Sequence, residues 1–188
     1  YYHLVLLAEN NQGYSNLMKI VSAGFVEGYY YKPRVDLQLL EKYHEGLIAL
    51  SACLAGEVAT YIRENNYEKA KNTALRLQDL FGKDNFFLEL QDHGIPDQTK
   101  VNTALLKMSK ETGIDLVATN DIHYTFKEDA EAHDILLCIQ TGKKVQDEDR
   151  MRYEGGQYYL KSPEEMQRLF PYAREAIENT GKLSLIHI

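Results

Sequence analysis

The chain has 188 residues, of which 44% are hydrophobic and 26% are charged. This composition is typical of one ordinary globular domain with a sizeable core, and it excludes a disordered chain. With 21 Lys and Arg against 28 Asp and Glu, the net charge is −7, so the chain lacks the basic excess of a typical nucleic-acid-binding surface. Any DNA binding would therefore depend on a local site.

The cysteines and the start of the chain indicate its setting. Cys53 and Cys138 are far apart, and neither a signal peptide nor an apolar run of membrane-spanning length accompanies them. These features predict a cytoplasmic protein with free thiols. The segment from Tyr1 to Leu7 reads as a strand in progress without an initiator Met, so we expect further sequence upstream.

Four apolar segments of strand length occur along the chain, each bounded by Gly, Asn, Asp or Ser. They are Leu4 to Ala8, Leu47 to Leu50, Phe86 to Leu90 and Leu116 to Ala118. Because these runs are almost uninterrupted, we expect buried parallel strands. The amphipathic helical patterns between them predict repeated βα units and a mostly parallel sheet or barrel.

Two of the helical patterns are especially clear. Their apolar faces are made of Ala70, Ala74, Leu77 and Phe81 in one and Val101, Ala104, Leu105 and Met108 in the other. Asp97 is the predicted N-cap of the second helix. Ser162 and Glu165 predict a capping box, with Pro163 at the first helical position. The charged segment from Lys143 to Gln157 predicts a long surface loop or lid.

Possible metal ligands follow three of the four strands. Cys53 follows the second, Asp92 and His93 follow the third, and Asp121 and His123 follow the fourth. Because the carboxyl ends of parallel strands meet at one face, we expect these side chains to converge. Asp121 and His123 are two residues apart, so they leave an extended backbone on the same side. A carboxylate with an imidazole suits zinc, manganese or iron better than calcium or magnesium.

Each candidate also has a purely structural explanation. Asp121 can begin a turn with Asn120. Cys53 can be a small buried apolar side chain, and His93, just before Gly94, can be a histidine exposed at a turn. Position at a strand end favours the ligand interpretation for Cys53 and for the Asp121 and His123 pair.

Several motifs together resemble one known family. They are His3-Leu4-Val5-Leu6-Leu7-Ala8, Lys32-Pro33-Arg34-Val35-Asp36, Leu47-Ile48-Ala49-Leu50-Ser51-Ala52-Cys53 and Val117-Ala118-Thr119-Asn120-Asp121-Ile122-His123-Tyr124. In this order and spacing they resemble the polymerase and histidinol phosphatase (PHP) domain of bacterial DNA polymerase III alpha subunits. The resemblance implies an α/β fold, namely a fragment of a distorted (β/α)7 barrel that lacks its first strands. It implies one such domain over residues 1–180.

The resemblance also implies roles for individual residues. The implied metal ligands are His3, Cys53, Asp121 and His123. Asp121 and His123, which match the final ligand pair of the family, are also the expected catalytic residues. His93, which matches a histidine in the corresponding turn of metal-binding family members, and Asp92 are second-rank site residues, and no coordinating role is assigned to them. Arg34 suits bidentate contacts with a phosphate, although a surface salt bridge explains it equally well.

The implied activity depends on metal ions. Zinc or manganese is expected at this site, and magnesium at the polymerase site of the parent protein. The parent would be a DNA-directed DNA polymerase, a nucleotidyltransferase, whose PHP site has a 3′ to 5′ exonuclease or phosphoesterase role. Expected partners are DNA, the sliding clamp and the proofreading subunit. The opening motifs of the family, among them a His-x-His pair, have no counterpart in the chain, so we expect the fragment alone to be inactive.

Two other functions remain open. One is a free-standing PHP phosphoesterase that acts on a small phosphate ester, and the other is a metal-stabilised structural module without catalysis. A palm domain downstream in the full gene would indicate the polymerase, and its absence the phosphoesterase. Loss of the upstream His-x-His pair would indicate the structural module.

The remaining histidines are not expected to join the site. His44 lies in a polar connection and His133 lies within a helical run, so both are predicted to be structural or surface residues. His187 belongs to the segment from Gly181 to Ile188, which departs from the family pattern. We expect that segment to be an atypical, non-native tail.

The net charge of −7 predicts weak binding of single-stranded DNA. At ~0.15 M salt, where exposed charges are screened beyond about 8 Å, a titration with a fluorescent oligonucleotide should not reach saturation. Tight binding that is independent of sequence at this salt concentration would contradict the prediction.

Overall fold

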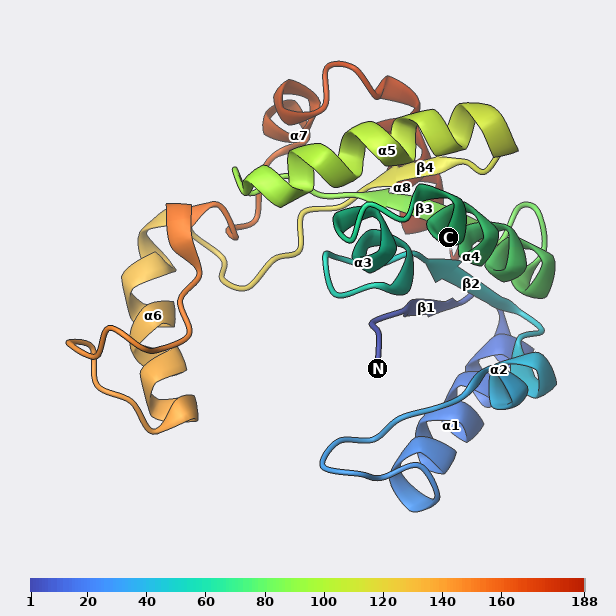
Figure 1. Ribbon diagram of the computed structural model, residues 1–188, viewed down its shortest axis with the longest axis horizontal. Coiled ribbons are helices and arrows are strands. Elements are labelled where there is room, and N and C mark those ends of the chain that lie inside the picture. The colour runs from blue at the N-terminus through green and yellow to red at the C-terminus, as the bar shows by residue number, and fades with distance from the viewer. Residues whose placement is uncertain (188) are drawn as a thin grey trace.

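The computed structural model describes residues 1–187 and consists of a four-stranded sheet with helices packed around it (Figure 1). The strands, in order across the sheet, are β1 (Val5–Ala8), β2 (Leu47–Leu50), β3 (Phe86–Leu90) and β4 (Leu116–Ala118). These bounds confirm the four predicted strands to within one residue. The helices are α1 (Asn11–Val26), α2 (Leu37–Tyr43), α3 (Glu57–Arg63), α4 (Tyr67–Phe81), α5 (Pro96–Thr112), α6 (Ala130–Thr141), α7 (Pro163–Leu169) and α8 (Arg174–Ser184), with short 3-10 turns η1 (Lys127–Asp129) and η2 (Glu154–Gly156).

The first strand runs against the other three. β2, β3 and β4 are parallel, whereas β1 is antiparallel to β2, with Val5 opposite Leu50. The prediction of buried parallel strands is therefore wrong for β1, where Val5 is 36% exposed. The chain leaves β1 and enters β2 at the same end of the sheet, where Glu9 N donates to Gly46 O at 2.9 Å. An apolar run does not encode strand direction, which here follows from the out-and-back path through α1 and α2.

Successive residues of the strands alternate between two faces of the sheet. Leu47, Ala49, Phe86, Leu88 and Leu90 belong to the main core, together with buried residues of α1 to α5 and of the α7–α8 region. Ile48, Leu50, Phe87 and Val117 form a smaller cluster on the second face. The predicted apolar face of α4 is confirmed, because each of its four residues is at most 4% exposed.

Two predicted helix starts have different outcomes. α5 begins with Ile95 as N-cap and Pro96 at the first position, so Asp97 lies inside the first turn and its assignment as N-cap is wrong. Proline starts the helix here because its φ is preset and it has no N–H to satisfy. The capping box of α7 is confirmed: Ser162 Oγ accepts from Glu165 N at 3.2 Å, and Glu165 Oε2 accepts from Ser162 N at 2.8 Å.

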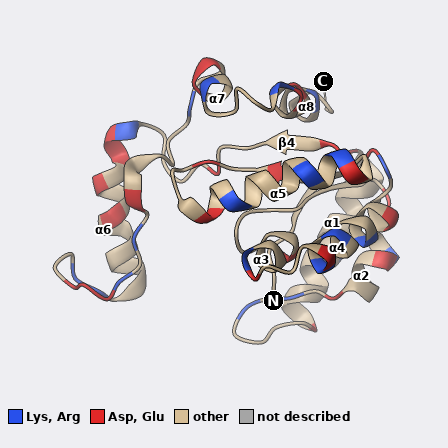
Figure 2. Ribbon diagram, turned by 45° about the horizontal axis from the view of Figure 1, so that its top comes forward, with Lys and Arg blue, Asp and Glu red and all other residues tan. Residues whose placement is uncertain are grey.

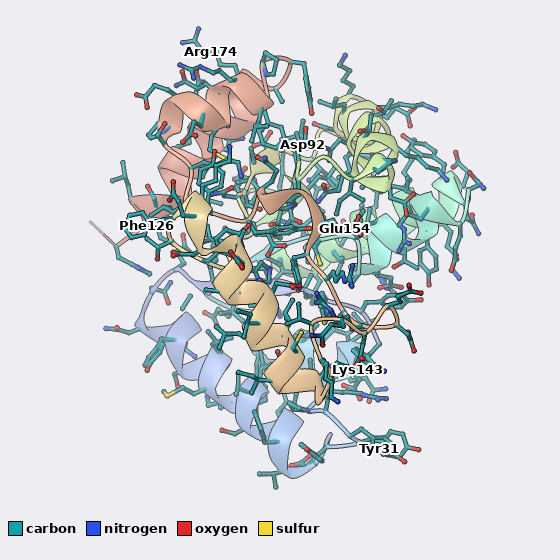
Figure 3. The ribbon with its side chains drawn as sticks, turned by 90° about the vertical axis from the view of Figure 1, so that its left-hand side faces the viewer. Tyr31, Asp92, Phe126, Lys143, Glu154 and Arg174 are labelled. Carbon is teal, nitrogen blue, oxygen red and sulfur yellow. The ribbon has the colours of Figure 1, made fainter. Side chains whose placement is uncertain are left out.

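α6 and residues 142–157, called here the arm, extend away from the sheet (Figure 1). Figure 3 looks onto the arm, with Lys143 near the far end of α6 and Glu154 on the returning segment. Arg150 fastens this segment to α6, because its two Nη atoms donate to the carboxylate of Asp134 at 2.6 Å each. The predicted surface loop is confirmed, apart from the 3-10 turn η2.

α8 covers the outer edge of β4. Asn179, which is 3% exposed, donates from Nδ2 to Leu116 O at 2.8 Å, and Thr180 Oγ1 donates to Ala118 O at 2.6 Å. A covered strand edge needs such partners, because buried backbone carbonyls without donors are costly. Side chains of α8 thus close the sheet where no further strand is paired within residues 1–187.

The segment expected to be an atypical tail starts inside α8, which ends at Ser184. Leu183 and Ile186 pack against the second face of the sheet, and His187 Nε2 lies 2.6 Å from the carbonyl oxygen of Ala8. The non-native origin of residues 181–188 stays a prediction, and Ile188 lies outside the described residues.

The cysteines and the helices agree with what the sequence predicts. Cys53 and Cys138 are both free thiols. Among the helices of residues 1–187, none combines the length and the apolar character needed to cross a bilayer.

The edge closure by α8 can be tested with Asn179→Leu. The substitution leaves the carbonyl of Leu116 buried without a donor, so we expect the free energy of unfolding in urea to fall by about 1–3 kcal/mol. Glu175→Leu, at an exposed position of the same helix, is the matched control and should change it little. Equal losses in the two variants would contradict a specific role for Asn179.

Candidate functional site

Strained backbone marks the ends of β2 and β4. Ala52 has φ 63° and Asp121 has φ 44°, both in the left-handed region that non-glycine residues rarely adopt. Such conformations cost about 1–3 kcal/mol each and persist only where the surrounding structure imposes them. Ala52 precedes Cys53 directly, so both strained positions lie at candidate ligands.

The turn after β2 brings Cys53 to His3. His3 N donates to Ala55 O at 3.0 Å, and a Cβ added to Gly56 would lie 2.2 Å from Ser51 O, so the turn closes only with glycine there. In the resulting arrangement Cys53 Sγ lies 3.5 Å from His3 Nδ1. Two predicted ligands from different parts of the sheet are therefore adjacent.

Asp121 and His123 form a second pair, with 3.6 Å between Asp121 Oδ1 and His123 Nε2. The arm approaches this pair. The His123 ring centroid lies 4.5 Å from that of Tyr153 and 5.6 Å from that of His133. Sequence reasoning placed His133 outside the site, because nothing in a helical pattern reveals that α6 begins beside the turn that carries His123.

Glu89 is a site residue that sequence reasoning missed. It is 5% exposed on the second face of β3, and its Oε1 accepts from Thr119 Oγ1 at 2.5 Å and from Gln91 Nε2 at 3.0 Å. Its Oε2 and the neighbouring Gln91 Oε1 are buried without any donor. Buried acceptors rarely stay unpaired, so these two oxygens fit a cation or a bound donor. The signal was an acidic residue within an otherwise apolar strand.

The electrostatics of the site favour a cation. Burial raises the pKa of Glu89 above its ordinary value, and the charge of Asp121 raises it further, against hydrogen bonds that lower it. Burial also raises the pKa of the Cys53 thiol, with added repulsion from Asp121 and Glu89. Burial and the negative charge of Asp121 also raise the pKa of the Tyr153 hydroxyl. Anionic groups that raise one another's pKa values would be stabilised by a positive ion.

His93 and Asp92 have structural partners. His93 is 3% exposed, which excludes the exposed-turn explanation, and burial lowers its pKa. Its Nε2 lies 2.9 Å from Asn120 O, and its Nδ1 lies 2.8 Å from Gln98 Nε2. Asp92 Oδ1 accepts from Gly94 N at 2.9 Å within the turn.

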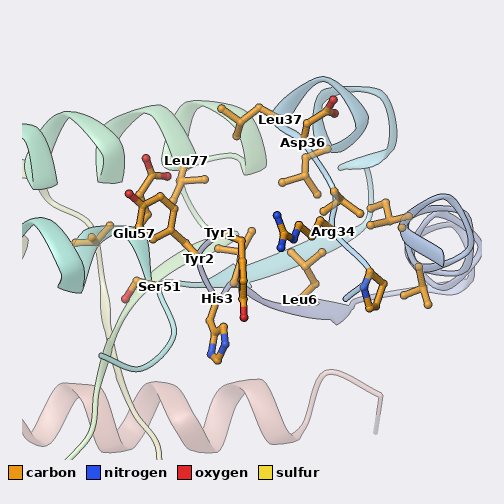
Figure 4. Close-up of a pocket in the computed structure, with 18 of the residues that line it drawn as sticks. Tyr1, Tyr2, His3, Leu6, Arg34, Asp36, Leu37, Ser51, Glu57 and Leu77 are labelled. Atoms are coloured by element: carbon orange, nitrogen blue, oxygen red, sulfur yellow. The ribbon is translucent and has the colours of Figure 1, made fainter. Parts of the chain in front are cut away.

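Arg34 lies apart from these residues. It lines a cavity of about 680 Å³ beside β1, and Figure 4 shows its side chain within this cavity while the His3 ring points away from it. Its guanidinium stacks near the rings of Tyr1 and Tyr30, at 4.7 and 5.2 Å from their centroids. Between residues 1 and 187 no carboxylate forms an ion pair with Arg34. Its role toward phosphate stays a prediction.

The predicted ligands are thus brought together as two pairs. No three His, Cys, Asp or Glu side chains of residues 1–187 are grouped closely enough to hold one ion. Convergence of His3, Cys53, Asp121 and His123 on one metal cluster therefore stays a prediction. The donor types and the unpaired oxygen of Glu89 nevertheless fit a divalent cation.

Charges on the outer helices are mixed. Figure 2 shows Lys and Arg interspersed with Asp and Glu along α4 and α5. Such mixed surfaces attract polyanions poorly, which agrees with the net charge of −7.

Comparisons with known proteins point to one family. Residues 1–93 match the PHP domain. The chain is 51% identical over 183 residues to the DNA polymerase III subunit alpha of Borreliella burgdorferi, and 46% identical over 184 residues to that of Treponema pallidum. It is 41% identical over 187 residues to the Thermus aquaticus protein of the same name. These alignments cover 97–98% of this chain but only 15–16% of the relatives.

The buried carboxyl group of Glu89 predicts a pH-dependent stability. Because its folded pKa lies above the unfolded value, the folded state keeps the proton longer, and stability falls as pH rises through that interval. Glu89→Gln should remove this fall and stabilise the metal-free protein at neutral pH. Urea unfolding with a chelator, from about pH 5 to about pH 8, measures it.

The exposed Glu148→Gln is the control for the charge change and should leave the pH profile unaltered. A profile for Glu89→Gln that runs parallel to the wild-type profile would show that the carboxyl group is not strained by burial.

Proposed function

Since the chain is a PHP-domain relative of bacterial DNA polymerase III alpha subunits, we propose that it forms the metal-binding PHP part of a replicative DNA polymerase. The parent protein would be a DNA-directed DNA polymerase, and its PHP site would hydrolyse phosphodiester bonds as a 3′ to 5′ exonuclease. The chain by itself would be inactive, because its donors form two pairs and not a complete cluster.

The positions of the candidate ligands are the main support for this proposal. Cys53, after β2, lies 3.5 Å from His3, just before β1, and Asp121 and His123, after β4, lie 3.6 Å from each other. Glu89, on the strand between β2 and β4, adds an unpaired buried oxygen. Thiol, imidazole and carboxylate donors together suit zinc or manganese.

The proposed reaction divides its tasks among residues of the chain. Bound divalent ions would polarise the phosphodiester and lower the pKa of a water molecule. Cys53, His3, Asp121 and His123 would hold the ions. Tyr153 packs against the His123 ring, with the centroids 4.5 Å apart, and would limit its rotation.

The fold and the partners of the parent protein are proposed from the PHP family. The sheet β1–β4 would be part of a distorted (β/α)7 barrel whose first strands lie outside this chain, and residues 181–188 would lie outside the domain. DNA, the sliding clamp and the proofreading subunit are the proposed partners of a cytoplasmic parent. Magnesium would serve its polymerase site.

A metal-stabilised structural module without catalysis is the second candidate. It is favoured by the absence, within residues 1–187, of any group of three ligands around one point. A free-standing phosphoesterase has less support, because the relatives named above are DNA polymerase III alpha subunits.

Single substitutions in the full-length parent should lower metal content to different extents, because Cys53 and the Asp121 and His123 pair need not bind the same ion. Asp121→Asn and His123→Ala should lower metal content and abolish exonuclease activity, while polymerisation, which uses other residues, continues. Cys53→Ser should also lower metal content, because a hydroxyl is a much poorer zinc ligand than a thiolate. Elemental analysis and separate exonuclease and polymerase assays measure these effects.

Cys138→Ser is the matched control for Cys53→Ser, since Cys138 is a free thiol in the arm. It should keep the wild-type metal content. Unchanged metal stoichiometry in the Asp121, His123 and Cys53 variants would show that these residues are only structural. Full metal content without exonuclease activity in the wild type would select the structural module.

A further inference from the structure

His93 is held by reciprocal hydrogen bonds with Gln98. Gln98 Oε1 accepts from His93 N at 2.8 Å, and Gln98 Nε2 lies 2.8 Å from His93 Nδ1. An amide nitrogen can only donate, so Nδ1 is the acceptor. Nε2 then carries the proton and donates it to Asn120 O at 2.9 Å. His93 is therefore a neutral imidazole with both ring nitrogens engaged.

The same ring supports the turn from a second direction. It stacks on Tyr158, with centroids 4.1 Å apart and planes inclined by 8°. The backbone oxygen of Tyr158 accepts from His123 N at 2.9 Å. His93 thus contacts the residue that fixes the backbone of His123.

Asn120 is fixed at three atoms. Besides its carbonyl oxygen, bonded to His93, its Nδ2 donates to Tyr159 O at 2.7 Å and its Oδ1 accepts from Lys161 Nζ at 3.2 Å. Lys161 is only 7% exposed, so this contact is well shielded from water. The next residue, Asp121, has the strained φ of 44°. Bonds that hold Asn120 in place are what a strained neighbour requires.

We propose that His93 is a positioning residue, which holds the turn from Thr119 to His123 in the conformation that presents Asp121 and His123 together. It is not a metal ligand. Coordination would require a free lone pair, and freeing one would break buried hydrogen bonds to Gln98 or Asn120. Only the measurement of Zn²⁺ affinity depends on the proposed metal site, since the conformation of the turn can be tested without metal.

Two substitutions in the full-length parent separate positioning from coordination. In His93→Gln the side-chain amide can reach as far as the imidazole Nε2 and donate to Asn120 O. In His93→Phe the ring can still stack on Tyr158, but both hydrogen bonds are lost. Hydrogen exchange of residues 120–124 in the metal-free protein reports the turn, and a Zn²⁺ titration reports the site.

We expect His93→Phe to speed exchange in the turn and to weaken Zn²⁺ binding by about 10- to 100-fold. His93→Gln should recover most of both properties. Asp121→Asn is the control for loss of a ligand, and it should abolish or weaken Zn²⁺ binding without faster exchange at Asn120. If His93→Phe does not fold, Gln98→Leu removes the partner of Nδ1 and should shift both measurements in the same direction.

Two results would overturn the inference. Zn²⁺ binding by His93→Gln as weak as by His93→Phe, with wild-type exchange in the turn, would identify His93 as a ligand. Wild-type exchange and affinity in both variants would show that the contacts with Asn120 have no effect. Failure of the wild type to bind Zn²⁺ would refute the proposed function, whereas the exchange comparison would still decide the positioning role.

Discussion

The parallel pairing of β2, β3 and β4 is the constraint on which the candidate site depends. It places the turns that follow these strands at the same end of the sheet, so Cys53 and Asp121, which are far apart in the sequence, both follow strands that finish there. The antiparallel β1 brings His3 to this region from the beginning of its strand, beside Cys53. Rigid strands buried on both faces then hold the turns more precisely than loops could hold themselves.

The site combines several local conflicts, although Tyr31 and Asn65 also adopt positive φ elsewhere in the fold. The Glu89 carboxylate is buried on the second face of β3, one of its oxygens has no donor, and Ala52 and Asp121 adopt positive φ. Elsewhere, the apolar faces, the capping box and the covered sheet edge are mutually consistent. Local conflicts in an otherwise consistent structure are expected at functional sites, where stability is traded for chemistry.

The surroundings of Asp121 and His123 come from distant parts of the chain. α5 and the turn after β3 supply Gln98 and His93, and the arm supplies aromatic rings. The sheet therefore sets where the turn begins, while these contacts set its conformation. The bidentate ion pair between Arg150 and Asp134 holds the returning segment of the arm to α6, whereas His93 contacts the turn itself.

Local chemistry by itself determined the extents of the four strands, the buried face of α4, the capping box at Ser162 and the family motifs, because periodicity, caps and motif spacing depend on neighbours in sequence. Only the tertiary structure decided the direction of β1, the start of α5 at Pro96, the unpaired oxygen of Glu89 and the burial of His93. It also placed His133 beside His123. These features depend on which distant segments pack together, and neither an apolar pattern nor a residue type specifies its partner across the fold.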